Sequence, residues 1–380
     1  MRRFAHCFLT VSLCSLTLSG CSQDGQSPPA AKQESYLSKD PFYDGYRFGG
    51  KGVIDVGAQP LTLPEWSVAE LISRDETLAA RLRESGASLQ MFPFRKGMDI
   101  NNFLSKGDLE VGIFADMPAI TAAATGDVVI IAMLKQGFAS IVARKPMLVN
   151  GLKGKRVATG IGSAAHFTLL QALENAGMTE SDITLVPMEV SDMPRALAVG
   201  RIDAFSAWEP TPTIAFAAHP QFYLVQKGLN YGFLCLRRDF AAAHPAETRE
   251  IAAAVARSCL WMRLPGNLAQ VPPWAGASAA SFQGESYALK PAQMTAITRN
   301  ELLDMPGAPR IPETVLQEHQ LLYKKFIFLK KTGKIPETTP WSRVRDSFDP
   351  EMLREVMGEP DRFALKQFDY RGAKKPDGAK

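Results

Sequence analysis

The stretch from Gly151 to Pro210 alternates between the pattern of a buried strand and that of an amphipathic helix, and this alternation constrains the fold most. The predicted order is strand, helix, strand, helix, strand. The three strands are expected over Arg156 to Thr159, Ile183 to Pro187 and Ile202 to Ala207. Strands that alternate with helices form parallel sheets with crossover helices, so the stretch predicts an α/β unit.

A glycine-rich turn, Gly160-Ile161-Gly162, follows the first of these strands and leads into a helix that begins near Ser163. The first amides of such a helix have no intrahelical partner, and they offer N–H donors and partial positive charge to an anion. We therefore predict that Ser163, Ala164 and His166 contact a ligand. The alternatives are that Ser163 only caps the helix and that His166 is an ordinarily packed or exposed side chain.

A second α/β unit precedes this one in the chain. Its strands are expected over Val53 to Val56, Ser88 to Phe92, Leu109 to Phe114 and Val128 to Leu134. Extended crossings near Ser140 to Ala143 and near Gly232 to Leu236 are expected to join the two units. Two lobes joined in this way predict a clamp whose hinge closure buries a ligand between them.

Several segments, among them GLKGKRVA, GSAAHF, ALENAGM and GRIDAFSAWEP, closely resemble the extracytoplasmic substrate-binding proteins of ABC importers in the taurine, aliphatic sulfonate and nitrate family. FRKGMDINNFLSKGDLEVGIFADMPAI and FLKKTGKIPE agree in the same order, and the resemblance spans roughly residues 50 to 340. It implies an α/β, two-lobed periplasmic-binding-protein-like fold of type II, shared with thiamine-precursor-binding proteins, with two inter-lobe crossings and C-terminal helices. It also implies a small-molecule ligand, an ABC permease and ATPase as partners, no cofactor and a monomer.

Ligands of open α/β sheets bind beyond the carboxyl ends of the strands. Trp208 and Glu209 follow the last strand of the second unit, and Gln59 follows the first strand of the first unit. Trp208 is expected to form a wall of the cleft, with a core position as its alternative. Glu209 is expected either to accept hydrogen bonds from a ligand or to form an ion pair across the lobes, and the sequence leaves both open.

Asp116 and Met117 precede Pro118, where sulfonate binders of the family that this chain resembles present small hydroxyl residues. A carboxylate repels a sulfonate by roughly 1 to 4 kcal/mol at close range in a partly solvated cleft. If Asp116 only caps a helix, it occupies the place that an anion would take. We therefore expect a ligand with a cationic or hydrogen-bond-donating end, or with a larger apolar body against Met117. Phe138 is expected to add an apolar wall, with ordinary packing as the alternative.

The N-terminus predicts export and a lipid anchor. Residues 1–20 combine two arginines with a short apolar run, which is typical of a secretory signal. Leu18-Ser19-Gly20-Cys21 looks like a bacterial lipobox, so Cys21 is expected to carry acyl chains such as palmitate; the alternative is a free cysteine in a cleaved peptide. Residues 21–45 then form a lipidated tether that holds the protein on the extracytoplasmic side of a bacterial membrane.

The remaining boundaries place residues 46–142 and 238–345 in the first lobe, 143–237 in the second, and 346–380 in a C-terminal extension that is disordered from Tyr370. The net charge of +4 falls to about +2 without the signal, and a charge this small does not indicate nucleic-acid binding. Cys235 and Cys259 are expected to be buried free thiols, with a disulfide as the alternative. Neither a CxxC motif nor a His/Cys cluster supports a metal site.

Two other functions compete with the importer receptor. One is a sensory or scaffolding lipoprotein that has the same fold and no transporter. The other is an enzyme, because the fold also serves a thiamine-pyrimidine synthase. The sequence shows no Ser, Cys or Asp partner at a suggestive spacing from His166, so we expect a receptor without catalytic residues.

Overall fold

The computed structural model describes residues 41–284 and 288–374, all within one unit, Lys39–Lys380. The predicted signal, Cys21 and most of the tether lie outside the described residues. Within the described ranges, no helix is both long and apolar enough to cross a membrane.

One mixed sheet of eight strands, in the order β2-β1-β3-β8-β4-β7-β5-β6, organises the described chain. β1 pairs in parallel with β2 and β3, and β5 pairs in parallel with β6 and β7. The strands are β1 Val53–Ala58, β2 Ser88–Pro93, β3 Val111–Ala115, β4 Val128–Ala143, β5 Arg156–Thr159, β6 Thr184–Pro187, β7 Ala204–Trp208 and β8 Tyr223–Arg237.

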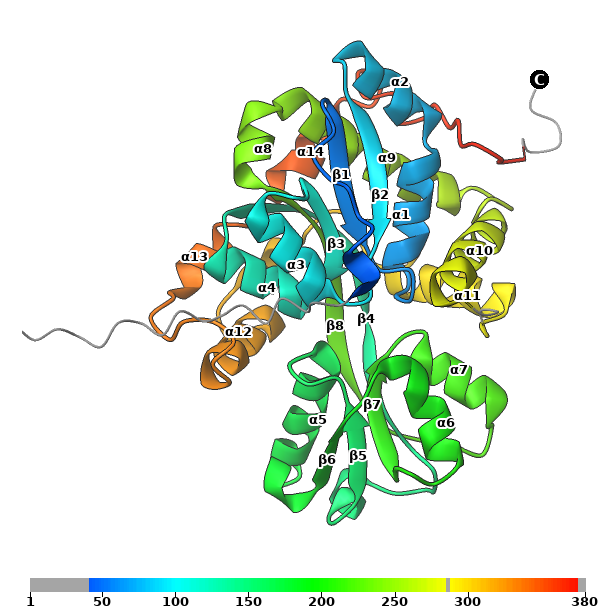
Figure 1. Cartoon of the computed structure of the whole chain (residues 1–380), viewed down its shortest axis with the longest axis vertical. Helices are drawn as coiled ribbons and strands as arrows, with labels where there is room; N and C mark the ends of the chain where they lie inside the picture. Colours follow the sequence, from blue (N-terminus) through cyan, green and yellow to red (C-terminus); the bar gives the residue numbers. More distant parts are fainter. Residues whose placement is uncertain (1–40, 285–287, 375–380) are drawn as a thin grey trace, which may run out of the picture. The chain divides into compact units, whose positions relative to one another are not determined.

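The two central strands, β4 and β8, are long, antiparallel to each other, and continue from the first lobe into the second (Figure 1). The sequence pattern predicts a strand over Val128 to Leu134 and a separate crossing over Ser140 to Ala143, but both belong to β4. Register shifts between Ile130 and Ala132 and between Met133 and Lys135 interrupt its pairing. Such bulges bend a strand without ending it, which explains why one strand serves both lobes.

The first lobe comprises β1 to β3 and the adjoining halves of β4 and β8, with helices around them. Its helices are α1 Glu65–Arg74, α2 Glu76–Glu84, α3 Gly97–Lys106, α4 Asp116–Thr125, α8 Arg238–Ala243, α9 Pro245–Arg263, α10 Val271–Gln283, α11 Pro291–Thr298, α12 Leu321–Lys331, α13 Trp341–Arg345 and α14 Glu351–Gly358. The sequence pattern of residues 67–84 predicts a single helix. Asp75 divides it, because its carboxylate caps α2 at Leu78 N and pairs with the buried Arg257. The core of this lobe contains most of the buried apolar residues.

The second lobe consists of β5 to β7 with α5 Ala164–Asn175, α6 Met193–Ala198 and α7 Thr211–Ala218. It has two small cores. One contains Leu169 and Leu173, which lie on the same face of α5, and the other contains Leu197 and Phe205. Helices therefore cover this part of the sheet on both faces, which is the arrangement that alternating strands and helices favour.

The C-terminal region is more ordered than the sequence pattern predicts. The sequence of residues 264–281 predicts a loose segment, yet most of α10 lies there. Pro272 and Pro273 fall in the first turn of this helix, where their missing N–H groups cost nothing. The prediction that disorder starts at Tyr370 is wrong, because Tyr370 is buried with its ring centroid 4.9 Å from that of Trp261. Residues 375–380 lie outside the described residues. Cys235 and Cys259 are buried free thiols, as predicted.

Candidate ligand-binding site

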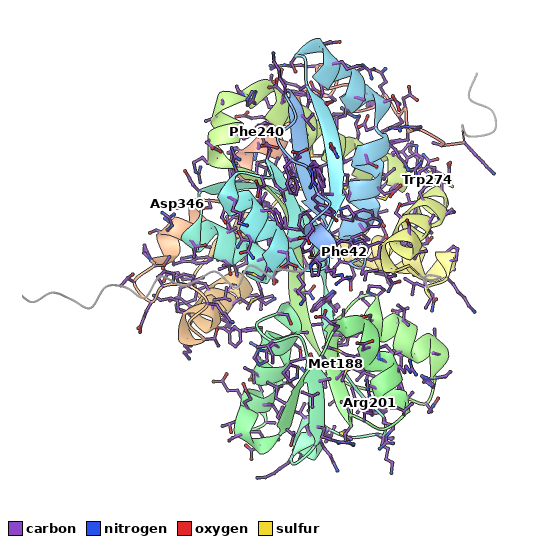
Figure 2. All side chains as sticks on the ribbon, viewed as in Figure 1. Phe42, Met188, Arg201, Phe240, Trp274 and Asp346 are labelled. Carbon is purple, nitrogen blue, oxygen red and sulfur yellow. The ribbon has the colours of Figure 1, made fainter. Side chains whose placement is uncertain are left out.

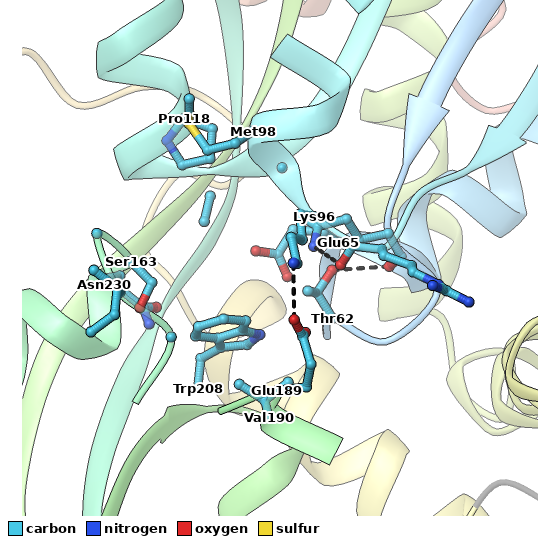
Figure 3. Close-up of a pocket in the computed structure, with 18 of the residues that line it drawn as sticks. Thr62, Glu65, Lys96, Met98, Pro118, Ser163, Glu189, Val190, Trp208 and Asn230 are labelled. Atoms are coloured by element: carbon cyan, nitrogen blue, oxygen red, sulfur yellow. Dashed lines mark hydrogen bonds and ion pairs between the residues drawn. The ribbon is translucent and has the colours of Figure 1, made fainter. Parts of the chain in front are cut away.

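The carboxyl ends of six strands meet around one cavity of about 540 Å³ (Figure 3). Three strands come from each lobe, and each contributes residues at or just beyond its end. These lining residues are Gln59 after β1, Arg95 and Lys96 after β2, Ala115 at the end of β3, Gly160 to Ala164 after β5, Met188 to Val190 after β6 and Trp208 at the end of β7. Met188 lies on the edge of the second lobe nearest the first, and Phe42 on the facing edge of the first (Figure 2).

The turn after β5 brings the start of α5 to the cavity. Gly162 has a left-handed backbone (φ 77°), which glycine adopts without strain. The Ser163 hydroxyl accepts a hydrogen bond from His166 N at 3.2 Å, and Ala164 lines the cavity beside it. Ser163 therefore caps α5 and also faces the cavity, so the two interpretations of this residue are compatible.

His166 is turned away from the cavity. Its Nδ1 accepts a hydrogen bond from Gly162 N at 3.1 Å, its Nε2 lies 3.6 Å from a Glu180 carboxylate oxygen, and its ring packs edge-on against Phe328. Burial lowers the pKa of His166 below its ordinary value, although Glu180 opposes the shift. The structure corrects the predicted ligand contact: His166 holds the turn instead, as the packing alternative has it.

Trp208 forms a wall of the cavity from the second lobe, between the Ser163 turn and the loop that carries Glu189 (Figure 3). It is the last residue of β7 and pairs with Ala139 of β4, so the sheet fixes the position of its backbone. Its side chain is half-buried, which leaves part of the indole surface for a ligand.

Asp116 and Met117 do not line the cavity, and this corrects the prediction for both. Asp116 is fully buried, with its Oδ2 2.5 Å from Lys325 Nζ and accepting a hydrogen bond from Tyr231 N at 2.8 Å. Met117 is 1% exposed and belongs to the core of the first lobe. Ala115 and Pro118 face the cavity in their place, so no carboxylate from the start of α4 meets a ligand.

Phe138 and Glu209 also lie outside the cavity lining. The Phe138 ring is exposed and lies under Lys227 Nζ, 5.3 Å from its centroid. A Glu209 carboxylate oxygen accepts a hydrogen bond from Thr213 N, in the first turn of α7, at 3.3 Å. The structure thus gives Glu209 a role that neither of the predicted alternatives included.

Gln59 lines the cavity from the first lobe, as predicted. Its Nε2 donates to the Arg95 carbonyl at 3.2 Å, which ties the loop after β1 to the loop after β2. Tyr43 supports the second loop, because its hydroxyl accepts from Arg95 N and donates to Asp99. Lys96 Nζ then reaches across the cavity mouth to Glu189 at 2.9 Å, where both side chains are more than half exposed.

The floor of the cavity was not predicted. Lys135 of β4 and Asn230 of β8 line it, together with Glu65 at the start of α1. Lys135 Nζ donates to the Leu63 carbonyl at 2.8 Å and lies 3.7 Å from a carboxylate oxygen of Glu65 and 3.4 Å from one of Glu301. Burial raises the pKa values of both carboxyl groups, and Lys135 partly opposes the shift. Burial also lowers the pKa of Lys135, but Glu65, Glu301 and Glu209 together outweigh it and raise this pKa overall.

Glycine at position 232 is required by this floor, because a Cβ there would collide with the Glu65 carboxylate. We expect Gly232→Ala to lower the free energy of unfolding by about 1 to 3 kcal/mol, the usual cost of overpacking a tight site. Glu65 is held by Lys135 and cannot move aside freely. Urea denaturation measures the change. Gly45→Ala is the control, since no atom lies within 4 Å of the Cβ that it would add, and equal stability of the two variants would contradict the expectation.

Comparison with known proteins finds relatives among periplasmic binding proteins. Residues 82–264 match the protein family described as "NMT1/THI5 like". Over 289 residues, the chain is 24% identical to the taurine-binding periplasmic protein of Escherichia coli K12, covering 70% of this chain and 84% of that one. The chain therefore contains an NMT1/THI5-like region. It is homologous to the taurine-binding periplasmic protein and, over 146 residues at 32% identity, to a putative aliphatic sulfonates-binding protein of Escherichia coli K12.

Solved structures confirm the predicted fold. The aliphatic sulphonate binding protein SsuA of Escherichia coli superposes with a TM-score of 0.58 at 19% identity, covering 77% of this chain and 99% of SsuA. The nitrate-binding protein NrtA of Synechocystis PCC 6803 superposes with a TM-score of 0.60 at 13% identity, covering 82% and 90%. The mixed α/β architecture is therefore that of the periplasmic binding proteins.

Proposed function

We propose that this protein is the extracytoplasmic, lipid-anchored receptor of an ABC importer, and that it captures a small organic molecule in the cavity between its lobes. The observation that carries the proposal is the convergence of six strand ends on one cavity. Its volume of about 540 Å³ falls in the usual range of small-molecule sites. The homology to periplasmic taurine- and sulfonate-binding proteins supports the transport role.

Ligand capture follows from how the lobes are joined. Ser163, Ala164 and Trp208 face the cavity from the second lobe, and Gln59 with Ala115 and Pro118 faces it from the first. Bending of β4 and β8 would bring these two walls together around a ligand. The Lys96–Glu189 pair spans the mouth and would favour the closed arrangement, although an exposed pair of this kind contributes little energy.

A ligand screen tests the proposal. Purified protein is mixed with taurine, alkanesulfonates, nitrate, pyrimidines and amines, and the unfolding temperature is recorded. A ligand at one hundred times its dissociation constant adds about 2.7 kcal/mol of stability. We expect at least one compound to raise the unfolding temperature, to bind in calorimetry, and to be recovered unchanged. Chemical conversion of the bound compound, or no binder in any of these classes, would count against the receptor role.

The lipid anchor is tested separately. Cells that express the protein are grown with a clickable palmitate analogue, and incorporation is read from the purified chain. We expect label on the natural chain and none on Cys21→Ser, because the thiol of Cys21 is the proposed acylation site. Equal labelling of the two proteins would exclude Cys21 as the anchor.

A further inference from the structure

The cavity floor is one face of the two shared strands. Lys135 pairs with Gly232 across β4 and β8, and Gly137 pairs with Asn230 two positions further along. Since alternate residues of a strand share a face, these four positions point the same way. The two glycines leave room for carboxylates from elsewhere: a Cβ at Gly232 would meet Glu65, and a Cβ at Gly137 would meet Glu301. This face therefore combines two carboxyl groups, one ammonium group and one amide, and of these residues Glu65, Lys135 and Asn230 line the cavity.

The floor leaves hydrogen-bond acceptors unused. Asn230 is 2% exposed and lines the cavity, yet its Oδ1 accepts no hydrogen bond. Glu65 is equally buried and lines the cavity, and its Oε2 has no hydrogen-bond donor, only the longer ion pair with Lys135. A buried polar atom without a partner is costly, so such atoms in a cavity indicate where a ligand group binds.

The charged groups of the floor also indicate what kind of ligand group binds there. Lys135 is the cation that Glu65 and Glu301 share, and its Nζ already donates to the Leu63 carbonyl. Two carboxyl groups face one ammonium in this buried site, and burial raises the pKa of both. A positively charged ligand group beside Glu65 would favour the ionised form of this carboxyl group, whereas an anionic group would oppose it.

We propose, on the basis of the function proposed above, that the cargo carries a protonated amine or amidine, and that Glu65 and Asn230 select it. In this arrangement the N–H groups of the cargo donate to Glu65 Oε2 and Asn230 Oδ1 at the floor. The body of the cargo lies against Trp208 and the apolar side chains Met98, Pro118 and Met188. An anionic group elsewhere on the same molecule is compatible with the amides at the start of α5.

Calorimetry with matched probes tests this inference on the purified protein. Taurine is compared with ethanesulfonate, which lacks only the ammonium group, and benzamidine is compared with benzenesulfonate. We expect the amine or amidine of each pair to bind at least tenfold more tightly. Glu65→Gln keeps an acceptor but removes the charge, so it should weaken binding of the cationic probes at least tenfold. Glu359→Gln, a carboxylate on the exposed surface, is the control and should change nothing.

A second pair of variants keeps the inference testable if Glu65→Gln does not fold. Asn230→Leu removes the acceptor and should weaken binding of the cationic probes at least tenfold. Asn230→Asp has only acceptors in its side chain and should retain binding of these probes. The unfolding temperature without ligand reports whether each variant is folded. Sulfonates that bind better than their cationic partners, with no effect of position 65 or 230, would overturn the inference and leave the receptor role standing. No binding by any probe of either pair would overturn the inference and count against the receptor role as well.

Discussion

Replacing Trp208 by alanine is expected to weaken ligand binding at least tenfold while leaving the fold intact. The indole is a wall of the cavity, and its half-buried side chain makes it a large contact surface for a ligand. A tenfold loss corresponds to about 1.4 kcal/mol, which is less than the loss of a full aromatic contact commonly costs. The fold should survive because the backbone pairing of β7 with β4 does not depend on the side chain. Calorimetric titration with a compound from the ligand screen measures the affinity.

Phe138→Ala provides the matched control for Trp208→Ala. Phe138 is also aromatic and lies in β4, one residue before the partner of Trp208, but it is 41% exposed and does not line the cavity. Its removal should leave the affinity unchanged. If Trp208→Ala binds as tightly as the natural protein, Trp208 does not contact the ligand, and the position of the cargo has to be reconsidered.

The second large effect is expected from Lys325→Met. Lys325 of α12 and Asp116 of α4 form an ion pair with both side chains fully buried. Removing the ammonium leaves a buried carboxylate whose hydrogen bond from Tyr231 N does not neutralise its charge. Breaking a buried pair in this way typically costs about 3 to 5 kcal/mol. We expect a loss of this size in the free energy of unfolding, measured by urea denaturation.

Two further variants show whether that loss comes from the unpaired charge. Arg362→Met removes an exposed partner of Glu359 and should change stability by about 0.5 kcal/mol or less. The double variant Asp116→Asn with Lys325→Met removes both charges and should recover a large part of the lost stability. A cost below about 1 kcal/mol for Lys325→Met alone would mean that the buried pair is not what holds α12 on α4.

Sequence periodicity was sufficient for the elements that place the candidate site. The strands β1, β2, β5 and β6 were predicted to within two residues at each end, because each is a short apolar run bounded by turn residues. Since ligand sites of parallel sheets lie at strand ends, Gln59, Ser163 and Trp208 could be assigned to one cavity from their positions alone.

The direction of a side chain could not be predicted in the same way. Asp116 was correctly predicted to follow the carboxyl end of β3. Its side chain nevertheless points into the core, because Lys325, 209 positions later, pairs with it there. No local pattern connects the two residues. The prediction for His166 is wrong for a similar reason. Its spacing places it in the first turn of α5, but a hydrogen bond from the backbone N–H of Gly162 orients its ring.

The cavity floor was missed because it lies in the middle of two strands rather than at their ends. One signal was available. Lys135 is the only charged residue in the long apolar stretch that forms β4, and a lysine in such a strand needs a carboxylate partner nearby. The partners themselves, Glu65 and Glu301, lie 70 and 166 residues away along the chain, so no local pattern singles them out.

Lys135 and Asn230 belong to the same two strands that connect the lobes. A ligand bound to these residues contacts the hinge strands directly, so no other part of the protein has to transmit its presence to the hinge. Ligand binding and closure of the lobes would then be one coupled step, and a permease could distinguish loaded from empty receptors without a dedicated signalling element.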